Sequence, residues 1–524
     1  LIFAGSRTLE GAVFSQPLSI VTIKEAAKTN LWPNVYTTVA EMNASTISST
    51  IESMGGKIMF LIGLIGIFMT LLKDSKGERK VEYFILLILW FVGAIYATTK
   101  GIRFTLILAP AYAIGFGFAV GWVYEHASRW ISKEMNIGIS LTKIVIVIVL
   151  CMLLVPTLKS ANATSVGEMS MMNDAWYNSL QKIDKEASKD AIINSWWDYG
   201  HWFKAIADRA VTFDGASQNR PQAHWIGKVL LTSNEEEAIG ILRMLDCGAN
   251  NAFDVINNET DDMHKSVDLI YKIIVMDKDS ARKELLKYFP ADKAELILKY
   301  THCSPPEDYF ITSEDMVGKA GVWAHFGSWD FEKAKIWVEF RNLPLNDAVS
   351  RMMNEFNYTK DNAEKIYYEI QAISNEQEAN NWISPWPGYI TATACSKGEN
   401  STVVCSFNLQ NQVIPIEVNT KTEEAFIETT KGIIYPYSLS YIDNSGQFRE
   451  KKYSNATMPY SMALINNTEG VQGILMSPEL ASSMFTRLFY FNAAGLKHFD
   501  KFEYQRDVTG QDIYIWKVDW QGKK

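Results

Sequence analysis

The chain has 524 residues, of which 48% are hydrophobic, and its formal net charge is −9. A chain of this length exceeds what one hydrophobic core usually fills, so at least two domains are expected. The acidic balance, with no basic array and no Cys/His finger spacing, argues against a nucleic-acid partner.

The first 56 residues precede every apolar segment and are interpreted as an external loop. The chain starts at Leu1, with no initiator Met and no signal sequence, which indicates the carboxy-terminal part of a longer protein. Near the end of this loop, Trp32-Pro33-Asn34 is followed by Thr38-Val39-Ala40-Glu41. Taken alone, Glu41 is either a solvated loop carboxylate or a ligand-binding group.

Four apolar runs follow, each near the length that a helix needs to cross a membrane. The runs are Lys57–Leu72, Tyr83–Thr98, Phe104–Tyr124 and Ile137–Val155. Pro110 interrupts the third run, which transmembrane helices tolerate when neighbouring helices satisfy the freed backbone groups. The sequence therefore predicts a multi-pass α-helical transmembrane bundle of four helices over residues 57–156.

The basic residues between these runs predict the orientation of the bundle, because connectors rich in Lys and Arg stay in the cytoplasm. The first and third connectors are the basic ones, with Lys73, Lys76, Arg79 and Lys80 in the first and Arg129 and Lys133 in the third. The connector between runs two and three offers only Lys100 and Arg103. We therefore expect residues 1–56 and 159–524 on the exterior side of a cell membrane.

Residues 157–388 are predicted to form a mixed α/β exterior domain. Its expected helices include Asp262–Val275, Ser280–Phe289, Asp292–Tyr300, Asp330–Phe340, Leu345–Glu355 and Thr359–Ile373. Residues 389–476 change to short β-rich runs, typical of a second domain or an insertion, with strands expected at Ile390–Ala394, Thr402–Asn408, Val413–Val418 and Gly432–Tyr441. Over residues 477–524, a helix near Pro478–Phe491 and a strand at Asp512–Val518 are expected to return to the first exterior unit.

Four of the five cysteines fall in the exterior part. Cys395 and Cys405 bracket four residues between two β-rich stretches, so they are candidates for a disulfide across a hairpin. Cys247 and Cys303 are the other candidate pair, although spacing alone does not decide connectivity.

The most informative run of the chain is Trp196-Trp197-Asp198-Tyr199-Gly200. Two indole N–H donors and a carboxylate can surround a small hydroxyl group, while the indole rings exclude water. Gly200 permits a turn that is closed to other residues. The structural alternative is an aromatic core cluster with a satisfied aspartate.

These five residues match the WWDYG motif, and the chain therefore resembles the catalytic subunits of oligosaccharyltransferases, most closely the archaeal dolichyl-phosphooligosaccharide-protein glycotransferases. The resemblance implies a partial bundle of the GT-C type followed by the exterior domain. It also implies transfer of an oligosaccharide from a polyprenyl (dolichyl) phosphate carrier to Asn in Asn-x-Ser/Thr of an acceptor polypeptide. Trp196 to Gly200 would hold the Ser/Thr hydroxyl, as the acceptor-binding pocket.

The same resemblance assigns roles to residues outside this run. Thr38 to Glu41 are similar to the family's TIxE-type motif, so Glu41 would bind the acceptor amide and help to surround a catalytic Mn²⁺ or Mg²⁺. Arg103, at the start of the third span, would hold the lipid phosphate or an acceptor carboxylate. The alternative for Arg103 is an arginine that reaches the membrane interface.

Asp262, Lys265 and Leu269 fall on one face of a predicted helix and resemble the family's DxxKxxxM motif, with Leu where Met is commoner. By resemblance they would complete the wall of the hydroxyl pocket. A solvated charged helix face is the alternative. The later run from Ser313 to Lys319 is a competing alignment that we rank second.

Two other functions remain open from the sequence. A non-catalytic, membrane-anchored exterior protein that binds glycans or proteins would also account for the tryptophans and the acidity, and a helper subunit derived from the enzyme would share its fold. The family supplies most of its metal ligands from two acidic motifs in upstream loops. We therefore expect this chain by itself to be incomplete as an enzyme.

Overall fold

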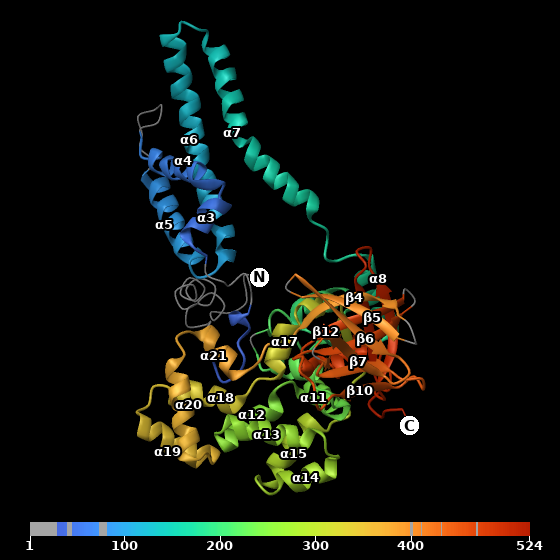
Figure 1. The fold of residues 1–524 in the computed structure, drawn as a ribbon. Coiled ribbons are helices and arrows are strands. Elements are labelled where there is room, and N and C mark those ends of the chain that lie inside the picture. Colours follow the sequence, from blue (N-terminus) through green and yellow to red (C-terminus); the bar gives the residue numbers. More distant parts are fainter. Residues whose placement is uncertain are drawn as a thin grey trace. The chain divides into compact units, whose positions relative to one another are not determined.

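The computed structural model describes residues 29–38, 45–72, 81–218, 220–398, 402–409, 411–430, 432–467 and 470–523. These residues form two compact units. The first unit comprises the helical part up to Met171, and the second comprises Met172–Lys524 together with the short segment Thr29–Val35. Figure 1 follows the elements of both units along the chain.

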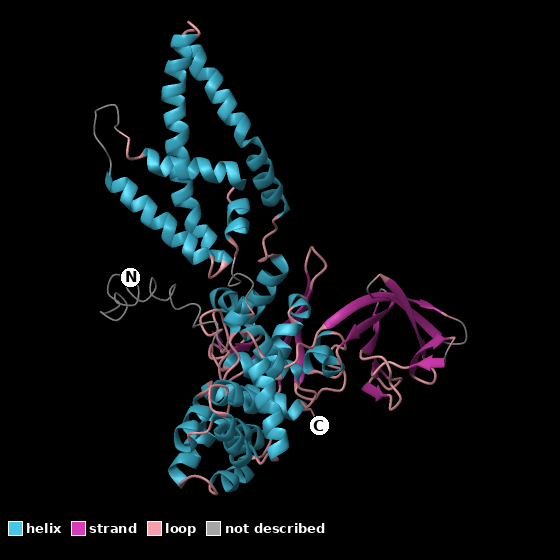
Figure 2. Ribbon diagram, turned by 60° about the vertical axis from the view of Figure 1, so that its left-hand side comes forward, coloured by secondary structure: helices cyan, strands magenta, loops and turns pink. Residues whose placement is uncertain are grey.

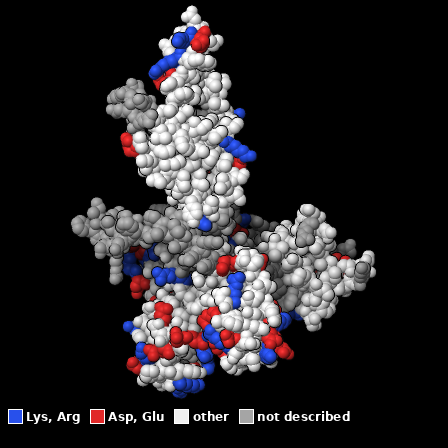
Figure 3. Space-filling model, turned by 90° about the vertical axis from the view of Figure 1, so that its left-hand side faces the viewer, with Lys and Arg blue, Asp and Glu red and all other residues white. Residues whose placement is uncertain are grey.

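The first unit consists of helices. They are α3 (Ile47–Ser53), α4 (Gly56–Met69), α5 (Val81–Thr98), the short 3-10 turn η4 (Ile102–Phe104), α6 (Thr105–Glu134) and α7 (Ile139–Gly167). Three of the described helices are long and apolar enough to cross a membrane: α5, α6 with η4, and α7. On the face that Figure 3 shows, a broad surface of this unit is free of charged side chains, as lipid contact requires.

The first predicted span differs from the sequence-based expectation. Helix α4 is short, and α3 precedes it at an angle of 88°. Gly55 and Gly56 lie at this bend, with φ values of +97° and +86° that glycine adopts at little cost. The described part of the bundle therefore has three candidate spans, and a fourth only if the bent pair α3–α4 counts as one.

Glycines allow α4 and α6 to approach closely. A Cβ atom added to Gly66 would lie 1.7 Å from the carbonyl oxygen of Gly115, and one added to Gly115 would lie 2.5 Å from the carbonyl oxygen of Gly63. Small residues at such crossings bring two backbones into contact, which is the main source of helix association in lipid. Gly63 and Gly66 of the first apolar run therefore serve packing, whereas Gly55 and Gly56, which precede that run, form the bend.

A five-stranded mixed sheet forms the centre of the second unit. In spatial order its strands are β13 (Phe499–Arg506), β14 (Asp512–Val518), β3 (Asp308–Ser313), β1 (Ile192–Asn194) and β2 (Ala210–Val211). β1 runs parallel to both β2 and β3, whereas β14 runs antiparallel to β3. The last strand of the chain therefore returns to the sheet that contains β1, as the sequence predicts.

The second unit also contains many helices. They are α8 (Asp174–Glu186), α9 (Gly200–Ala207), α10 (Gln222–Leu231), α11 (Glu235–Gly248), α12 (Asn251–Thr260), α13 (Met263–Ile274), α14 (Lys278–Leu285), α15 (Ala291–Thr301), α16 (Asp315–Gly318), α17 (Ala320–Gly327), α18 (Phe331–Lys335), the π-helical turn η6 (Ile336–Phe340), α19 (Leu345–Phe356), α20 (Lys360–Ala372), α21 (Glu376–Ile383) and α22 (Met484–Phe489). The six helices predicted between residues 262 and 373 are all present, with ends shifted by a few residues. Trp176 of α8 and Phe203 of α9 pack on Ile193, Tyr309 and Ile515 of the sheet.

A nine-stranded sheet lies apart from the five-stranded one, and Figure 2 shows it as a curled layer of strands. Its strands are β4 (Tyr389–Lys397), β5 (Thr402–Leu409), β6 (Gln412–Asn419), β7 (Glu424–Thr429), β8 (Gly432–Ile434), β9 (Ser438–Ile442), β10 (Phe448–Lys452), β11 (Ser461–Asn467) and β12 (Gly470–Met476). The run predicted as one strand over Gly432–Tyr441 is divided into β8 and β9. Pro436 lies between them and has no N–H to donate to a ladder.

Both candidate disulfides form. Cys395 of β4 and Cys405 of β5 are directly opposed in the antiparallel ladder and are bonded. Cys247 of α11 is bonded to Cys303, two residues after α15, so this bond joins two packed helices of the second unit. Cys151 remains a free thiol on α7.

Candidate functional site

The candidate site lies where three parallel strands end. Ile192 of β1 is in register with Asp308 of β3 on one side and with Ala210 of β2 on the other. The carboxyl ends of parallel strands meet at one edge of the sheet, and ligands of such sheets bind beyond that edge. The chain therefore brings together the residues that follow β1, which are Trp196 to Gly200, and those that follow β3, which begin with Glu314.

Asp198 and Lys319 form the charged centre of this edge. Lys319 Nζ lies 2.8 Å from Asp198 Oδ1 and 2.9 Å from Asp315 Oδ2. It also lies 5.4 Å from the centroid of the Tyr199 ring, in a cation–π arrangement. Burial alone would lower the pKa of Lys319, but the adjacent Asp315 and Asp198 outweigh it and raise this pKa. Lys319 is therefore a firmly charged partner for Asp198.

The second carboxylate oxygen of Asp198, Oδ2, has no partner among the residues that the structure describes. Oδ2 is buried and accepts no hydrogen bond from any residue that the structure describes. Burial raises the pKa of Asp198, and the opposing effect of Lys319 does not cancel it. A buried acceptor atom without a donor costs free energy, so an unpaired one at a conspicuous motif indicates a ligand that supplies the donor.

The two tryptophans of the motif differ in burial. Trp196 is buried, and its ring packs on Phe213 and Phe326 at centroid distances of 5.4 and 6.1 Å. Trp197 begins the 3-10 turn η5 (Trp197–Tyr199) and is half-buried. Within the described part of the chain neither indole N–H donates to a protein group, so both remain available to a ligand.

The Tyr199 ring packs against two tryptophans and holds the turn η5 in place. Its ring is stacked on Trp202 at 4.3 Å and meets Trp176 edge-on at 4.9 Å. Burial raises the pKa of Tyr199 to about 12, so the phenol stays neutral. Tyr199 thus joins the turn to the core beneath α8 and α9.

Gly200 has a role different from the one that the sequence suggested. Its φ is −55°, an ordinary helical value that any residue adopts. A Cβ at this position would lie 2.5 Å from Cβ of Asp214 and 2.8 Å from the carbonyl oxygen of Phe213. Glycine is therefore required here by the close approach of the chain that follows β2, and not by the turn.

Comparison with protein-family models identifies the family of this chain. Residues 6–162 match the family model described as oligosaccharyl transferase STT3, N-terminal, and residues 188–333 match that of the STT3/PglB/AglB core domain. The chain belongs to the STT3/PglB/AglB family. The two matched regions correspond to the helical unit and to the part of the second unit that carries Trp196 to Lys319.

Individual relatives agree with this family. The chain is 29% identical over 398 residues to a dolichyl-phosphooligosaccharide-protein glycotransferase of Methanococcus voltae, covering 60% of this chain and 43% of the relative. It is 31% identical over 386 residues to the protein of the same name from Methanocaldococcus jannaschii, covering 61% and 41%. Among solved structures it is similar to the archaeal oligosaccharyltransferase AglB from Archaeoglobus fulgidus in complex with an inhibitory peptide and a dolichol-phosphate, with 14% identity, a TM-score of 0.38, and coverage of 96% of this chain and 44% of that one. The chain thus spans about two fifths of the length of the relatives that it matches.

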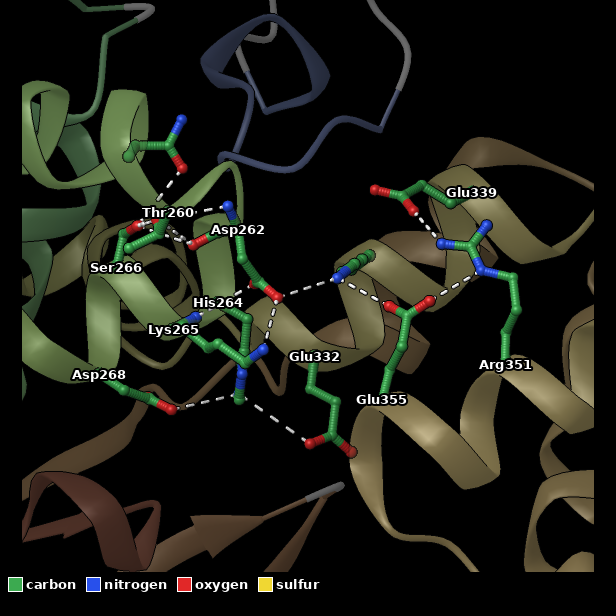
Figure 4. Close-up of polar contacts among 12 residues, drawn as sticks. Thr260, Asp262, His264, Lys265, Ser266, Asp268, Glu332, Glu339, Arg351 and Glu355 are labelled. Carbon is green, nitrogen blue, oxygen red and sulfur yellow. Dashed lines mark hydrogen bonds and ion pairs between the residues drawn. The ribbon is translucent and has the colours of Figure 1, made fainter. Parts of the chain in front are cut away.

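In this STT3/PglB/AglB chain, the helix face predicted to complete the hydroxyl pocket lies on α13 and makes other contacts. Its residues are Asp262, Lys265 and Leu269. Asp262 caps α13 by accepting from Lys265 N at 3.2 Å, and its Oδ2 lies 3.4 Å from Lys335 Nζ. Lys335 is paired in turn with Glu355 of α19 at 2.8 Å, and Figure 4 shows this network between the helices. The side chain of Lys265 is 71% exposed, and its carboxylate partner is Asp262.

In the described structure, no contact therefore joins Asp198 to Asp262, Lys265 or Leu269. The competing run from Ser313 to Lys319 does contact Asp198, because its Lys319 pairs with both Asp198 and Asp315. The sequence contains a partial signal for this outcome, because only Thr312 separates the short apolar run Tyr309-Phe310-Ile311 from Ser313 to Lys319. The structure shows this run as the buried strand β3, whose parallel pairing with β1 brings its carboxyl end to the motif.

Of the two remaining predicted residues, the structure describes only Arg103. Glu41 lies outside the described residues. Arg103 is in η4 at the start of α6, with an exposed side chain. Among the described residues no group of three His, Cys, Asp or Glu side chains could hold a metal ion. The described residues therefore do not fit a Mn²⁺ or Mg²⁺ site, and no step is assigned to a metal here.

Two buried acids lie directly beneath the motif. The Asn194 amide donates to Asp246 Oδ1 at 2.8 Å and to Asp308 Oδ1 at 3.1 Å. Both carboxyls retain a buried oxygen without a partner in the described structure. Burial raises the pKa of Asp308 to about 7, and burial together with Asp308 raises that of Asp246.

These pKa values predict how stability depends on pH. The buried pair Asp246 and Asp308 keeps a proton at pH values where the unfolded chain, whose aspartates titrate near pH 4, has released it, so the stability due to this proton is complete below about pH 4 and lost as the pH rises toward neutrality. The effect of His224 on stability has the opposite sign. Burial lowers its pKa to about 3, so the folded state loses stability as the pH falls below about 6.5, where the histidine of the unfolded chain binds a proton. Asp308→Asn removes one acid of the pair and also its effect on Asp246: thermal unfolding should show the wild type losing stability relative to this variant as the pH rises from about 4 to about 7. A constant difference would contradict the assignment.

Proposed function

We propose that the protein transfers an oligosaccharide from a polyprenyl (dolichyl) phosphate carrier to the side-chain amide of Asn in Asn-x-Ser/Thr sequons. Membership of the STT3/PglB/AglB family supports this reaction class. The relatives named above are dolichyl-phosphooligosaccharide-protein glycotransferases. The acceptor is a polypeptide, and the donor is a lipid-carried glycan.

The observation that carries the proposal is the unpaired buried oxygen of Asp198. A Ser or Thr hydroxyl of the sequon would donate to this atom, and the free indole N–H groups of Trp196 and Trp197 would donate to the hydroxyl oxygen or to the acceptor backbone. A site built in this way rejects residues without the hydroxyl, because its buried polar groups would then stay unpaired.

The chemical step in this proposal forms a bond between the Asn amide nitrogen and the anomeric carbon of the glycan. The bond from that carbon to the phosphate oxygen breaks, the lipid phosphate leaves with the bonding electrons, and the nitrogen loses one proton. Glu41 would accept an N–H of the amide and weaken its conjugation, and Arg103 would pair with the phosphate. The family resemblance also implies a Mn²⁺ or Mg²⁺, for which the described residues offer no site and to which we assign no step.

We also propose a multi-pass position in a cell membrane, with the second unit on the exterior side. The uncharged surface of α5 to α7 supports insertion, and the basic residues at the α6–α7 connection support the orientation. The test uses two variants of the protein, each expressed in intact cells. One carries a cysteine at Met135, in that connection, and the other carries a cysteine at Ser445, in the β-rich part. Equal labelling of both by an impermeant reagent would refute the orientation.

The experiment that tests the reaction uses the complete gene product in detergent with a dolichyl-phosphate-linked oligosaccharide. A labelled Asn-x-Thr peptide should gain the mass of the glycan, and the matched Asn-x-Val peptide should gain none. Binding of the Asn-x-Thr peptide without any transfer would support the non-catalytic binding protein instead.

A further inference from the structure

A groove of about 990 Å³ lies within the second unit, between its two sheets. The hairpin β13–β14 of the five-stranded sheet forms one wall, and β4 and β12 of the nine-stranded sheet form the other. We call it the hairpin groove and define it by Ile390, Ala392, Gln472, Lys501, Tyr504 and Tyr514. Ligand sites commonly have volumes of roughly 300–1,000 Å³, so the hairpin groove has room for an extended ligand.

The β4–β12 wall is uncharged. Residues that oppose each other in an antiparallel ladder have their side chains on the same face of the sheet. Ala392 of β4 is opposite Ile474 of β12, and Ala394 is opposite Gln472. Cys395 alternates with these residues and packs on the core of the β-rich part, which lies on the other face. None of the described residues that β4 and β12 contribute to the groove is charged.

The hairpin wall is aromatic and charged. Tyr504 of β13 is opposite Tyr514 of β14, and their ring centroids are 4.8 Å apart. Arg506 Nε lies 3.8 Å from Asp512 Oδ1, and the Tyr504 hydroxyl donates to the same oxygen at 2.9 Å. The negative charge of Asp512 is therefore already bound by groups of this wall.

Lys501 lacks an acidic partner in the part of the chain that the structure describes. Its Nζ lies 5.5 Å from the ring centroid of Tyr514 and 5.9 Å from that of Trp516. Burial lowers the pKa of Lys501, and no carboxylate raises it again. Glu314, at one end of the groove, does not compensate, because burial raises its pKa and favours its neutral form. A cation that is partly desolvated and has no counter-charge favours an anionic ligand.

One end of the hairpin groove adjoins the candidate site for the sequon. Glu314 and Val317 line the groove and follow β3 directly. Asp315, the residue after Glu314, pairs with Lys319, and Lys319 pairs with Asp198. The groove therefore begins beside the carboxylate that we propose to hold the sequon hydroxyl.

We propose that the hairpin groove binds the acceptor polypeptide on the carboxyl side of the sequon and prefers acidic residues there. The inference rests on the proposed function. When the Ser/Thr hydroxyl lies at Asp198, the chain that follows it leaves the site beside Glu314 and Val317. Side chains of an extended segment alternate in direction, so one set would meet the apolar wall and the other would meet Tyr504 and Lys501. A carboxylate in the second set would pair with the Lys501 ammonium group.

The expected effect is on peptide affinity and not on the rate of the chemical step, because the groove binds residues remote from the reacting atoms. The peptides to compare are an Asn-x-Thr peptide with a Glu-rich tail after the sequon and the same peptide with Gln in place of Glu. The Glu tail should lower KM by about three- to tenfold at equal kcat, between the effects of a surface ion pair and of a charged hydrogen bond.

Lys501→Glu is the deciding variant. It should abolish the advantage of the Glu tail and give an advantage to a Lys tail, because it reverses the charge of the wall. Lys501→Met should abolish the advantage without reversing it, and it serves if Lys501→Glu does not fold. The matched control is Lys185→Glu, which makes the same change at an exposed position of α8 outside the groove. This control should keep the wild-type order of the peptides.

The test uses the complete gene product and has two readouts. Transfer from a dolichyl-phosphate-linked oligosaccharide gives kcat and KM for each peptide, and fluorescence anisotropy of the labelled peptides gives their Kd without any transfer. We expect the Kd and the KM to change together, with the Glu tail preferred in the wild type and in Lys185→Glu.

Four results would overturn the inference. Equal values for the Glu and Gln tails in the wild type would show that the groove reads no charge, and an undiminished Glu advantage in Lys501→Glu would place the tail elsewhere. The same gain from a Glu-rich segment before the Asn would reverse the assigned direction of the polypeptide. A raised KM for the lipid-linked oligosaccharide in Lys501→Glu, with the tail preference unchanged, would assign the groove to the glycan.

Failure of the proposed function gives a different result. A wild-type protein that transfers no glycan to any of the peptides would overturn the proposed reaction. The Kd values would still decide whether the groove binds the acidic tail through Lys501.

Discussion

Asp198→Ala should lower kcat/KM for an Asn-x-Thr peptide by roughly 10- to 150-fold, because hydrogen bonds to charged groups contribute about 1.5–3 kcal/mol and Lys319 loses one of its two carboxylate partners. The preference for Asn-x-Thr over Asn-x-Val should disappear in the same variant. Single-turnover transfer with both peptides measures the two effects. The thermal midpoint should stay close to that of the wild type, since the removed group carries an unpaired buried oxygen.

The matched control for this prediction is Asp268→Ala, which removes a carboxylate whose side chain is 63% exposed on α13. Its transfer rate should equal that of the wild type. A folded Asp198→Ala variant with undiminished transfer would show that the Asp198 carboxylate does not hold the sequon hydroxyl.

The second large effect is expected at Lys319. Lys319→Met leaves Asp198 and Asp315 without their common cation, so Asp198 should be protonated more readily and should lose its fixed position. We expect kcat/KM for Asn-x-Thr to fall by roughly 10- to 100-fold, which corresponds to the loss of a charged hydrogen bond. The fall should be greater at pH 6 than at pH 8, because burial already raises the pKa of Asp198.

Lys265→Met is the comparison that separates the two alignments of the DxxKxxxM-type motif. Lys265 is largely exposed and lies 3.5 Å from Asp262, and surface ion pairs contribute about 0–1 kcal/mol. Its kcat/KM should therefore change by less than about twofold. If Lys265→Met reduced transfer and Lys319→Met did not, the helix face of α13 would form the pocket wall, and our placement of Lys319 would be wrong.

Local sequence patterns determined most of the elements of this protein. The apolar runs predicted α5, α6 and α7, because a membrane span depends on the composition of a single continuous segment. The helices between residues 262 and 373 and the strand β14 followed from periodicity in the same way. The run from Trp196 to Gly200 was conspicuous because several tryptophans around one aspartate are rare outside a pocket.

What the sequence left undecided depends on contacts between distant segments. Lys319 lies 121 residues after Asp198, and only the parallel pairing of β1 with β3 brings the two strand ends to one edge. The sequence pattern favoured Asp262 and Lys265 because helical spacing is visible locally, whereas the register of a sheet is not.

The same reason applies to Gly200 and to the hairpin groove. The requirement for glycine at position 200 comes from the backbone of Phe213 and Asp214, which no local turn preference contains. The hairpin groove exists only because β13 and β14, near the end of the chain, lie opposite β4 and β12. Residue type and periodicity thus determined the elements and the motif, and the tertiary structure alone decided the partners, because close packing joins side chains from segments whose separation along the chain carries no local signal.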